Sequence, residues 1–243
     1  MGLNLLRVLV TRPEPGASET ARRLEVLGFA PVVLPLSQTR ALPVDVAVIP
    51  ENVDAVAVTS ANALRHAPQN VLAMLAKTRC HAVGGKTASA ARQAGFSQVI
   101  EGPGDAAGLA ALLAEDRTGA KTIVYLCGRV RLAGFEARLT EAGVAVVAIE
   151  TYDTVEADAA SGLNLTSQPS GSFDIALLHS TLGAQALLKI VRRPEAIDLF
   201  VDTIFLCLSV RIASVLAEAG CTKIRVAAEP TEQALLFLLA EQS

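Results

Sequence analysis

The chain has 243 residues, a mass of 25.3 kDa, a net charge of −3 and 51% apolar residues. This length fits either one large α/β domain or two domains of roughly 120 residues, and length alone does not choose between them. An aromatic content of 4% on a slightly acidic chain excludes the basic, aromatic surface that nucleic acid binding requires. The longest apolar runs, such as residues 234–240, are far shorter than the roughly 18 residues of a membrane span, so we expect no membrane partner.

The start of the chain and its cysteines indicate the compartment. Met1 is followed almost at once by a predicted strand at residues 5–11, without a signal-peptide pattern, which favours the cytoplasm. Four cysteines lie far apart with no CxxC pair, in mostly strand-like surroundings where a thiol behaves as a small apolar group. We therefore expect neither a disulfide nor a structural metal.

A recurring junction predicts the fold class. Four helical patterns end in a small or apolar residue followed by glycine and then a strand, at Gly28, Gly95, Gly143 and Gly220. Glycine just after a helix accepts the left-handed conformation that stops it. Helices alternating with strands in this way predict an α/β class with mostly parallel sheets.

These junctions belong to a longer internal repeat of the sequence. A shift of 125 residues sets Gly95 on Gly220 and Lys86 on Arg211, and a shift of 120 sets Ser60 on Ser180. The chain then reads X, Y, X, Y. The strand-helix-strand unit X covers residues 5–36 and again 121–149, and the three-strand unit Y covers 54–113 and again 173–239.

Two assemblies fit this repeat. In the sequential one each X joins the Y that follows it, whereas in the nested one the first X joins the last Y and the middle Y and X form an inserted domain. The links 35–53 and 150–172 are the longest in the chain, while the link 114–120 resembles an ordinary loop. We therefore prefer nesting, with five strands in each flavodoxin-like sheet and ligands at the carboxyl ends of the strands.

The two long links give the predicted boundaries. In VAVVAIETYDTV, which starts at Val144, an apolar run turns polar at Glu150 with no stop signal. Its counterpart VVLPLSQTRAL passes through Pro35 into an extended tail. We read the two tails as paired crossings between domains, with Tyr152 in the cleft. The predicted domains are residues 1–37 with 155–243 and residues 42–149, and the linker strands are 38–41 and 150–154.

Familiar site motifs fail on inspection. Gly84-Gly85-Lys86-Thr87 hints at a phosphate loop, but the first glycine of that motif would fall on Cys80. The three histidines neither cluster with carboxylates nor carry HxxxH spacing, and no serine lies in GxSxG. Hydrolase, metal and nucleotide sites are therefore not indicated, and we expect no cofactor.

Strand-to-helix turns carry the remaining signal. Each presents small polar residues and backbone N–H groups at a helix N-terminus, where a carboxylate or phosphate can dock. Capping of the helices alone also explains each serine or threonine when taken singly. The candidate substrate-binding residues in these turns are Thr11, Arg12, Ser60, Asn62, Gly84, Lys86, Thr87, Arg129, Ser180, Ser209 and Arg211.

The succession of motifs resembles the uroporphyrinogen III synthase family over almost the whole chain. It runs from VLVTRP through VTSANAL, AVGGKTASAARQAGF, the GR pair, ETYDT and LLHSTLGAQALL to VAAEPTEQALLFLL. The resemblance implies two nested flavodoxin-like domains joined by a two-stranded β-ladder. Many members have a Gly-Pro-Thr-Thr-Ala turn where this chain has Ser209-Val210-Arg211-Ile212-Ala213, so no role of those threonines is carried over.

The resemblance also implies a chemistry. Such a lyase cyclises linear hydroxymethylbilane with loss of water and inversion of ring D, giving uroporphyrinogen III in haem biosynthesis without a cofactor. Tyr152 resembles the family's linker tyrosine, which is a hydrogen-bond donor to the departing hydroxyl, and a core tyrosine filling the domain junction is the structural alternative. The protein is expected as a cytoplasmic monomer, with hydroxymethylbilane synthase as candidate partner. A non-catalytic two-domain ligand-binding or regulatory protein of the same fold is the alternative function.

Overall fold

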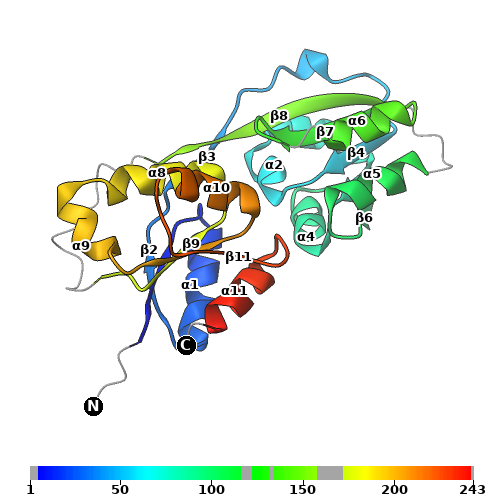
Figure 1. Cartoon of the computed structure of the whole chain (residues 1–243). Coiled ribbons are helices and arrows are strands. Elements are labelled where there is room, and N and C mark those ends of the chain that lie inside the picture. Colours follow the sequence, from blue (N-terminus) through cyan, green and yellow to red (C-terminus); the bar gives the residue numbers. More distant parts are fainter. Residues whose placement is uncertain (1–4, 116–121, 132–133, 158–171, 242–243) are drawn as a thin grey trace. The chain divides into compact units, whose positions relative to one another are not determined.

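The computed structural model describes residues 5–115, 122–131, 134–157 and 172–241. The chain divides into two compact units, one made of Met1–Gln38 with Val155–Ser243 and the other of Thr39–Thr154 (Figure 1). Each unit has its own mainly parallel sheet covered by helices on both faces. This is the α/β class that the helix-glycine-strand junctions predict.

The sheet of the first unit has the order β11-β10-β9-β1-β2, and all of its strand pairs are parallel. Its strands are β1 (Arg7–Val10), β2 (Ala30–Val33), β9 (Ile175–Leu178), β10 (Ile204–Cys207) and β11 (Ile224–Val226). Its helices are α1 (Gly16–Val26), α8 (Thr181–Val191), α9 (Ile197–Phe200), α10 (Val210–Glu218) and α11 (Glu232–Ala240), with a 3-10 turn at Pro194–Ala196.

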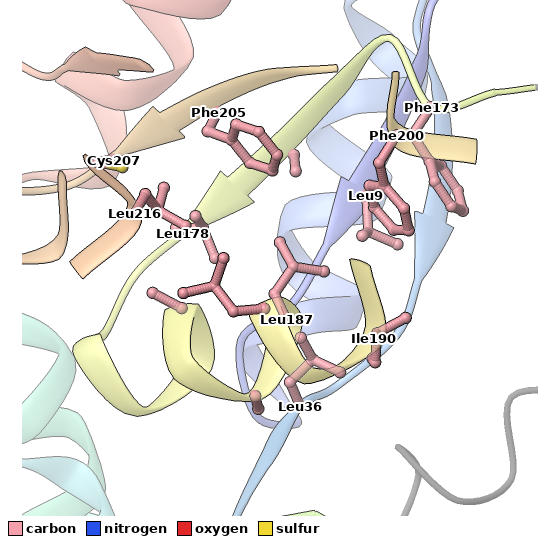
Figure 2. Close-up of a cluster of buried hydrophobic side chains, with 14 of the residues drawn as sticks. Leu9, Leu36, Phe173, Leu178, Leu187, Ile190, Phe200, Phe205, Cys207 and Leu216 are labelled. Atoms are coloured by element: carbon pink, nitrogen blue, oxygen red, sulfur yellow. The ribbon is translucent and has the colours of Figure 1, made fainter. Parts of the chain in front are cut away.

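The two faces of this sheet follow from the period-two alternation of side chains along a strand. Leu9 joins Phe173, Leu187 and Phe205 in the cluster drawn in Figure 2. Its neighbours on β1, Val8 and Val10, pack on the other face with residues of α1 and α11. Because both faces are buried, the strands read as continuous apolar runs rather than as alternating ones.

The sheet of the second unit has the order β3-β8-β7-β4-β5-β6. Its strands are β3 (Ser37–Ala41), β4 (Ala55–Val58), β5 (Arg79–Ala82), β6 (Val99–Glu101), β7 (Thr122–Gly128) and β8 (Ala145–Glu156). Its helices are α2 (Ala61–His66), α3 (Gln69–Leu75), α4 (Gly85–Gln93), α5 (Ala106–Ala114) and α6 (Gly134–Glu141), with a 3-10 turn at Val46–Val48.

Strand pairing decides between the two assemblies of the repeat. β1 pairs with β9, and β4 pairs with β7, so each sheet combines an X with the Y that is not its sequential partner. Nesting is therefore confirmed. In repeat terms β2-β1-β9-β10-β11 and β8-β7-β4-β5-β6 have the same spatial order, that of a flavodoxin-like sheet. The prediction of five strands per sheet is correct for the first unit, but the second has six among the described residues because β3 adds to its edge.

The two crossings between the units form a two-stranded ladder of β3 and β8, as predicted. The backbone N–H of Leu42 donates to the carbonyl of Thr151 at 2.9 Å, and that of Ala157 donates to Leu36 at 3.0 Å. Residue numbers therefore rise along one strand as they fall along the other, which makes the pair antiparallel. β8 continues past its own helix-covered sheet, and its pairing with β7 ends in a bulge at Cys127 and Gly128, where Gly128 lies opposite Tyr152.

The four glycine stops are confirmed. Gly28, Gly95, Gly143 and Gly220 all have positive φ, between 79° and 97°, where an L side chain would be strained. The cysteines Cys80, Cys127, Cys207 and Cys221 are free thiols. Across the described ranges, no helix is both long and apolar enough to cross a membrane.

Candidate active site at the carboxyl ends of the strands

The predicted site residues lie at the carboxyl ends of the strands, in two sets. Because the strands within each set are parallel, each set lies along one edge of its own sheet. The first unit holds Thr11, Arg12, Ser180, Ser209 and Arg211, which follow β1, β9 and β10. The second holds Ser60, Asn62, Gly84, Lys86, Thr87 and Arg129, which follow β4, β5 and β7, together with Tyr152 on β8.

Several of the small polar residues already have structural partners. The hydroxyl of Ser60 accepts from the N–H of Asn62 at 3.2 Å and that of Ser180 from Gly183 at 3.0 Å, so both serines cap helices. Thr11 is buried and donates to the carbonyl of Leu177 at 2.7 Å. Ser209 also precedes its helix, yet its side chain makes no cap hydrogen bond. Capping therefore accounts for the first two serines but not for Ser209.

Arg12 lies across the start of α1, and its charge is compensated within the chain. A Cβ atom on Gly16 would lie 2.6 Å from Nε of Arg12, so the guanidinium occupies the space that glycine leaves. Nη1 of Arg12 lies 3.3 Å from Oε1 of Glu232, which also accepts a hydrogen bond from Thr20 at 2.5 Å. Glu232 was not singled out from the sequence, because it lies near the opposite end of the chain and no local pattern connects it to Arg12.

His179 lies beside this ion pair at the end of β9. Burial, together with the positive charge of Arg12, lowers its pKa to about 4, and the carboxylate of Glu232 opposes this only in part. Its two ring nitrogens are buried and make no hydrogen bond with the described residues. At neutral pH this imidazole is uncharged.

Two other predicted bases remain exposed at helix N-termini. Arg211 lies in the first turn of α10 and makes no hydrogen bond or ion pair with the part of the chain that the structure describes. Lys86 lies in the first turn of α4, next to Gly85. Oε1 of Glu101 is 3.0 Å from the point where a side chain on Gly85 would begin, so a carboxylate of this chain already lies against that turn. Arg211 thus has the more open anion-binding position of the two.

Tyr152 is half-buried, its ring contacts Gly128 and His66, and its backbone carbonyl contacts Arg129. A Cβ atom on Gly128 would lie 2.7 Å from Cζ of Tyr152 and 3.0 Å from its hydroxyl, so the phenol lies directly over that glycine. His66 stacks at 5.9 Å between ring centroids and is itself 2.8 Å from the hydroxyl of Thr39. The carbonyl of Tyr152 accepts from the N–H of Arg129 at 2.8 Å. The Tyr152 hydroxyl makes no hydrogen bond with any described residue.

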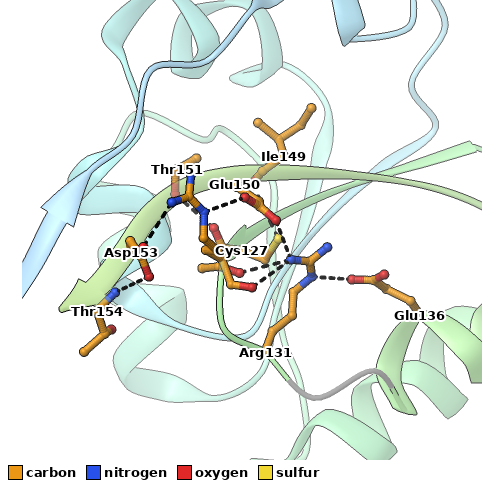
Figure 3. Close-up of polar contacts among 10 residues, drawn as sticks. Cys127, Arg131, Glu136, Ile149, Glu150, Thr151, Asp153 and Thr154 are labelled. Carbon is orange, nitrogen blue, oxygen red and sulfur yellow. Dashed lines mark hydrogen bonds and ion pairs between the residues drawn. The ribbon is translucent and has the colours of Figure 1, made fainter. Parts of the chain in front are cut away.

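A network of charged side chains surrounds the turn beside Tyr152 (Figure 3). Arg129 contacts Glu150 at 3.3 Å and Asp153 at 3.2 Å. Arg131 donates through Nε to Glu136 at 2.5 Å and through Nη1 to Glu150 at 2.9 Å. Arg129, predicted as a substrate-binding base, is therefore already paired with two carboxylates.

The network also shifts the pKa values of Arg131 and Glu150. The pKa of Arg131 is raised above its ordinary value, chiefly by its hydrogen bond to Glu136. Burial opposes this shift, and the hydrogen bond to Glu150 adds to it. A hydrogen bond from Arg131 lowers the pKa of Glu150, with burial opposing and Arg129 adding to the effect. Sequence reasoning missed Arg131, Glu136 and Asp153. A second arginine two residues after the one in the GR pair, and acidic residues on both sides of Tyr152, were the available signals.

The arrangement can donate a hydrogen bond without transferring charge. The phenol of Tyr152 can donate a hydrogen bond, its hydroxyl makes none with the described residues, and its ring already occupies the space over Gly128. The arginines next to it are held by carboxylates, so they add little net charge at the phenol. Such a group suits stabilisation of a leaving oxygen.

Comparison with known proteins identifies the family. The sequence matches the family described as uroporphyrinogen-III synthase HemD over residues 18–236. No curated protein sequence matches the chain.

Solved structures show the same fold. The uroporphyrinogen-III synthetase from Helicobacter pylori 26695 is 18% identical, with a TM-score of 0.64, and the match covers 98% of this chain and 100% of that one. A mutant uroporphyrinogen III synthase from the extremely thermophilic bacterium Thermus thermophilus is 20% identical, with a TM-score of 0.52, over 98% and 97% of the two chains. Because the family match spans most of the sequence, the chain belongs to the uroporphyrinogen-III synthase family, a family of cyclising lyases of haem biosynthesis.

Proposed function

We propose that this protein converts linear hydroxymethylbilane to uroporphyrinogen III, with Tyr152 as the hydrogen-bond donor to the departing hydroxyl. One observation carries the role of Tyr152. Its hydroxyl lies over Gly128 at the carboxyl end of β7 and has no hydrogen-bond partner among the described residues, although the ring beneath it is fixed. A half-buried donor left without a protein acceptor is available to a ligand.

The proposed first step is the loss of the substrate's hydroxyl. The carbon–oxygen bond breaks with the electron pair going to oxygen, the lone pair of the pyrrole nitrogen stabilises the cation that remains, and the departing hydroxide takes up a proton from solvent and leaves as water. Tyr152 donates to this oxygen as negative charge develops on it and retains its own proton. A single well-placed donor of this kind contributes about 10²- to 10³-fold to a rate.

Ring closure with inversion of ring D demands control of conformation. The hydroxyl departs even without a protein, and the unassisted product has the uninverted ring. The protein must therefore hold a folded conformer that favours inversion of ring D, which in this proposal proceeds through a spiro intermediate. Positioning of this kind is worth several kcal/mol when the reacting atoms are held close together. The charged side chains next to Tyr152 are paired with one another, and these surroundings fit a donor role better than full proton transfer.

The substrate's eight carboxylates require distributed binding. The exposed bases Arg211 and Lys86 and the N-termini of α4 and α10 are the proposed docking positions. Arg12 serves less directly, because a substrate carboxylate would have to compete with Glu232 for it. Ser209, whose hydroxyl caps no helix, is a further proposed donor.

The proposal includes a cytoplasmic monomer that needs no cofactor. Free cysteines support a reducing compartment, since thiols persist there. Hydroxymethylbilane synthase is the proposed partner, because it supplies a substrate that closes spontaneously and therefore has to be delivered quickly.

The test uses freshly prepared hydroxymethylbilane. The protein is incubated with it, the products are oxidised and the uroporphyrin isomers are separated, with heat-denatured protein as control. We expect predominantly the type III isomer above a type I background. Type I alone at every protein concentration would favour the non-catalytic alternative.

A further inference from the structure

The turn at Gly128 and Arg129 connects the charged network to Tyr152. Gly128 lies opposite Tyr152 where the β7–β8 pairing is irregular, and the N–H of Arg129 fixes the Tyr152 carbonyl at 2.8 Å. Any movement of this turn would therefore carry the phenol with it. Apart from that contact, Arg129, Val130 and Arg131 make no backbone-to-backbone hydrogen bond with another described residue, so side chains contribute to holding the turn.

Arg131 is the side chain that holds this turn (Figure 3). Nη1 of Arg131 lies 3.3 Å from the Gly128 carbonyl and 3.2 Å from the Arg129 carbonyl, and the same nitrogen donates to Glu150 at 2.9 Å. The contacts to the two carbonyls are long, whereas those to the carboxylates of Glu136 and Glu150 are short. The carboxylates of Glu136 and Glu150 thus fix the position of the Arg131 guanidinium, and the guanidinium in turn contacts both carbonyls of the turn.

The absence of a side chain on Gly128 completes the arrangement. A Cβ atom there would lie 2.7 Å from Cζ of Tyr152, which is closer than two non-bonded carbon atoms approach. The phenol ring of Tyr152 would therefore have to move away. The φ angle of Gly128 is not positive. Glycine is therefore needed at this position because Tyr152 approaches so closely, and not because of the backbone conformation.

We propose that Gly128 and Arg131 are positioning residues for Tyr152, Gly128 by leaving the space that the phenol occupies and Arg131 by holding the turn that carries it. The inference rests on the proposed function. Neither residue touches the reacting atoms. Each acts only through the place of the Tyr152 hydroxyl.

The first measurement is independent of activity. The chain contains two tyrosines, so labelling with 3-fluorotyrosine gives two fluorine resonances, and Tyr125→Phe assigns the one that remains to Tyr152. Gly128→Ala and Arg131→Ala should shift or broaden the Tyr152 resonance. Gly134→Ala is the matched control, because a Cβ atom there meets nothing within 4 Å. Arg138→Ala is the second control, since it removes an exposed arginine of α6 that has no side-chain partner among the described residues.

The second measurement is the rate of type III product formation. Gly128→Ala and Arg131→Ala should each lower kcat by about 10- to 100-fold with KM within about twofold, as for a displaced catalytic group. In a Tyr152→Phe background the same changes should cost less than about twofold more, because the group that they position is gone. Arg131→Lys should restore only part of the rate, since an ammonium cannot reach both carboxylates and the turn.

The outcomes separate this inference from the proposed function. A Tyr152 resonance unchanged in folded Gly128→Ala and folded Arg131→Ala would overturn the positioning role. Full additivity with Tyr152→Phe would overturn it as well. A resonance that moves while Tyr152→Phe keeps full activity would support the positioning and overturn the catalytic role of Tyr152. If Gly128→Ala fails to fold by circular dichroism, Arg131→Ala decides.

Discussion

Removal of the Tyr152 hydroxyl separates catalysis from packing, because the two tyrosines of this chain differ in what their hydroxyls contact. Tyr152 makes no hydrogen bond with the described residues, whereas the Tyr125 hydroxyl lies 2.7 Å from that of Thr59. Tyr125 is 2% exposed and packs on Phe135 at 4.6 Å between ring centroids. Tyr125→Phe is therefore the matched control for Tyr152→Phe.

The expected changes in stability follow from these contacts. Tyr152→Phe removes no hydrogen bond within the described chain and keeps the stack on His66, so the free energy of unfolding should change by less than about 0.5 kcal/mol. Tyr125→Phe loses one partly buried hydrogen bond and should cost about 1 kcal/mol, a fall in Tm of about 2 to 4 °C for a chain of this size.

The expected changes in rate have the opposite order. Tyr152→Phe should lower kcat by about 10- to 1,000-fold, or about 1.4 to 4 kcal/mol of transition-state stabilisation, with KM little changed. Tyr125→Phe should keep kcat within about threefold. Initial rates of type III formation, corrected for the spontaneous type I product, and urea unfolding give both quantities. Tyr152→Phe activity within about twofold of wild type, at unchanged Tm, would refute the reasoning and return Tyr152 to a packing role.

Further expectations concern binding, acid stability, domain structure and cofactors. Arg211→Ala should raise KM, by the equivalent of about 1 to 3 kcal/mol, and Arg12→Ala should raise it less because Glu232 already holds that guanidinium; loss of all activity in folded Arg211→Ala would contradict distributed binding. Because His179 titrates near 6.5 when unfolded and near 4 when folded, the unfolded state binds more protons between these values, and the free energy of unfolding should fall by up to about 3 kcal/mol as pH falls from 6.5 to 4; His179→Asn should flatten this fall in urea titrations. The fragment 42–149 should fold alone by circular dichroism, whereas stable halves from proteolytic cleavage at 116–119 would argue against it. Dialysis against a chelator should leave turnover intact, and activity lost and then restored by a divalent ion would contradict cofactor independence.

Most of the fold could be predicted from local sequence patterns. Gly95 and Gly220 were readable as helix stops because the left-handed conformation is a property of the residue itself. The nested topology followed from link lengths, since a short link constrains its two ends to neighbouring elements and a long one does not. The linker strand at 38–41 was predicted, but its place as a sixth strand of the second sheet was not, because residues 37–41 are polar and their own pattern does not indicate which sheet they join.

The sequence by itself determined the α/β class, the repeat, the nested order and the strand-end positions of the candidate residues, because periodicity and turn chemistry are local. Only the tertiary structure decided which of the candidate substrate-binding arginines form ion pairs with carboxylates of the chain. Arg12 is paired with Glu232 and Arg129 with Glu150 and Asp153, while Arg211 has no partner among the described residues. It also decided that Tyr152 lies over Gly128 and that Arg131 holds the adjoining turn. Ion pairs and close approaches join residues on different elements, so their geometry exists only once the sheets have formed.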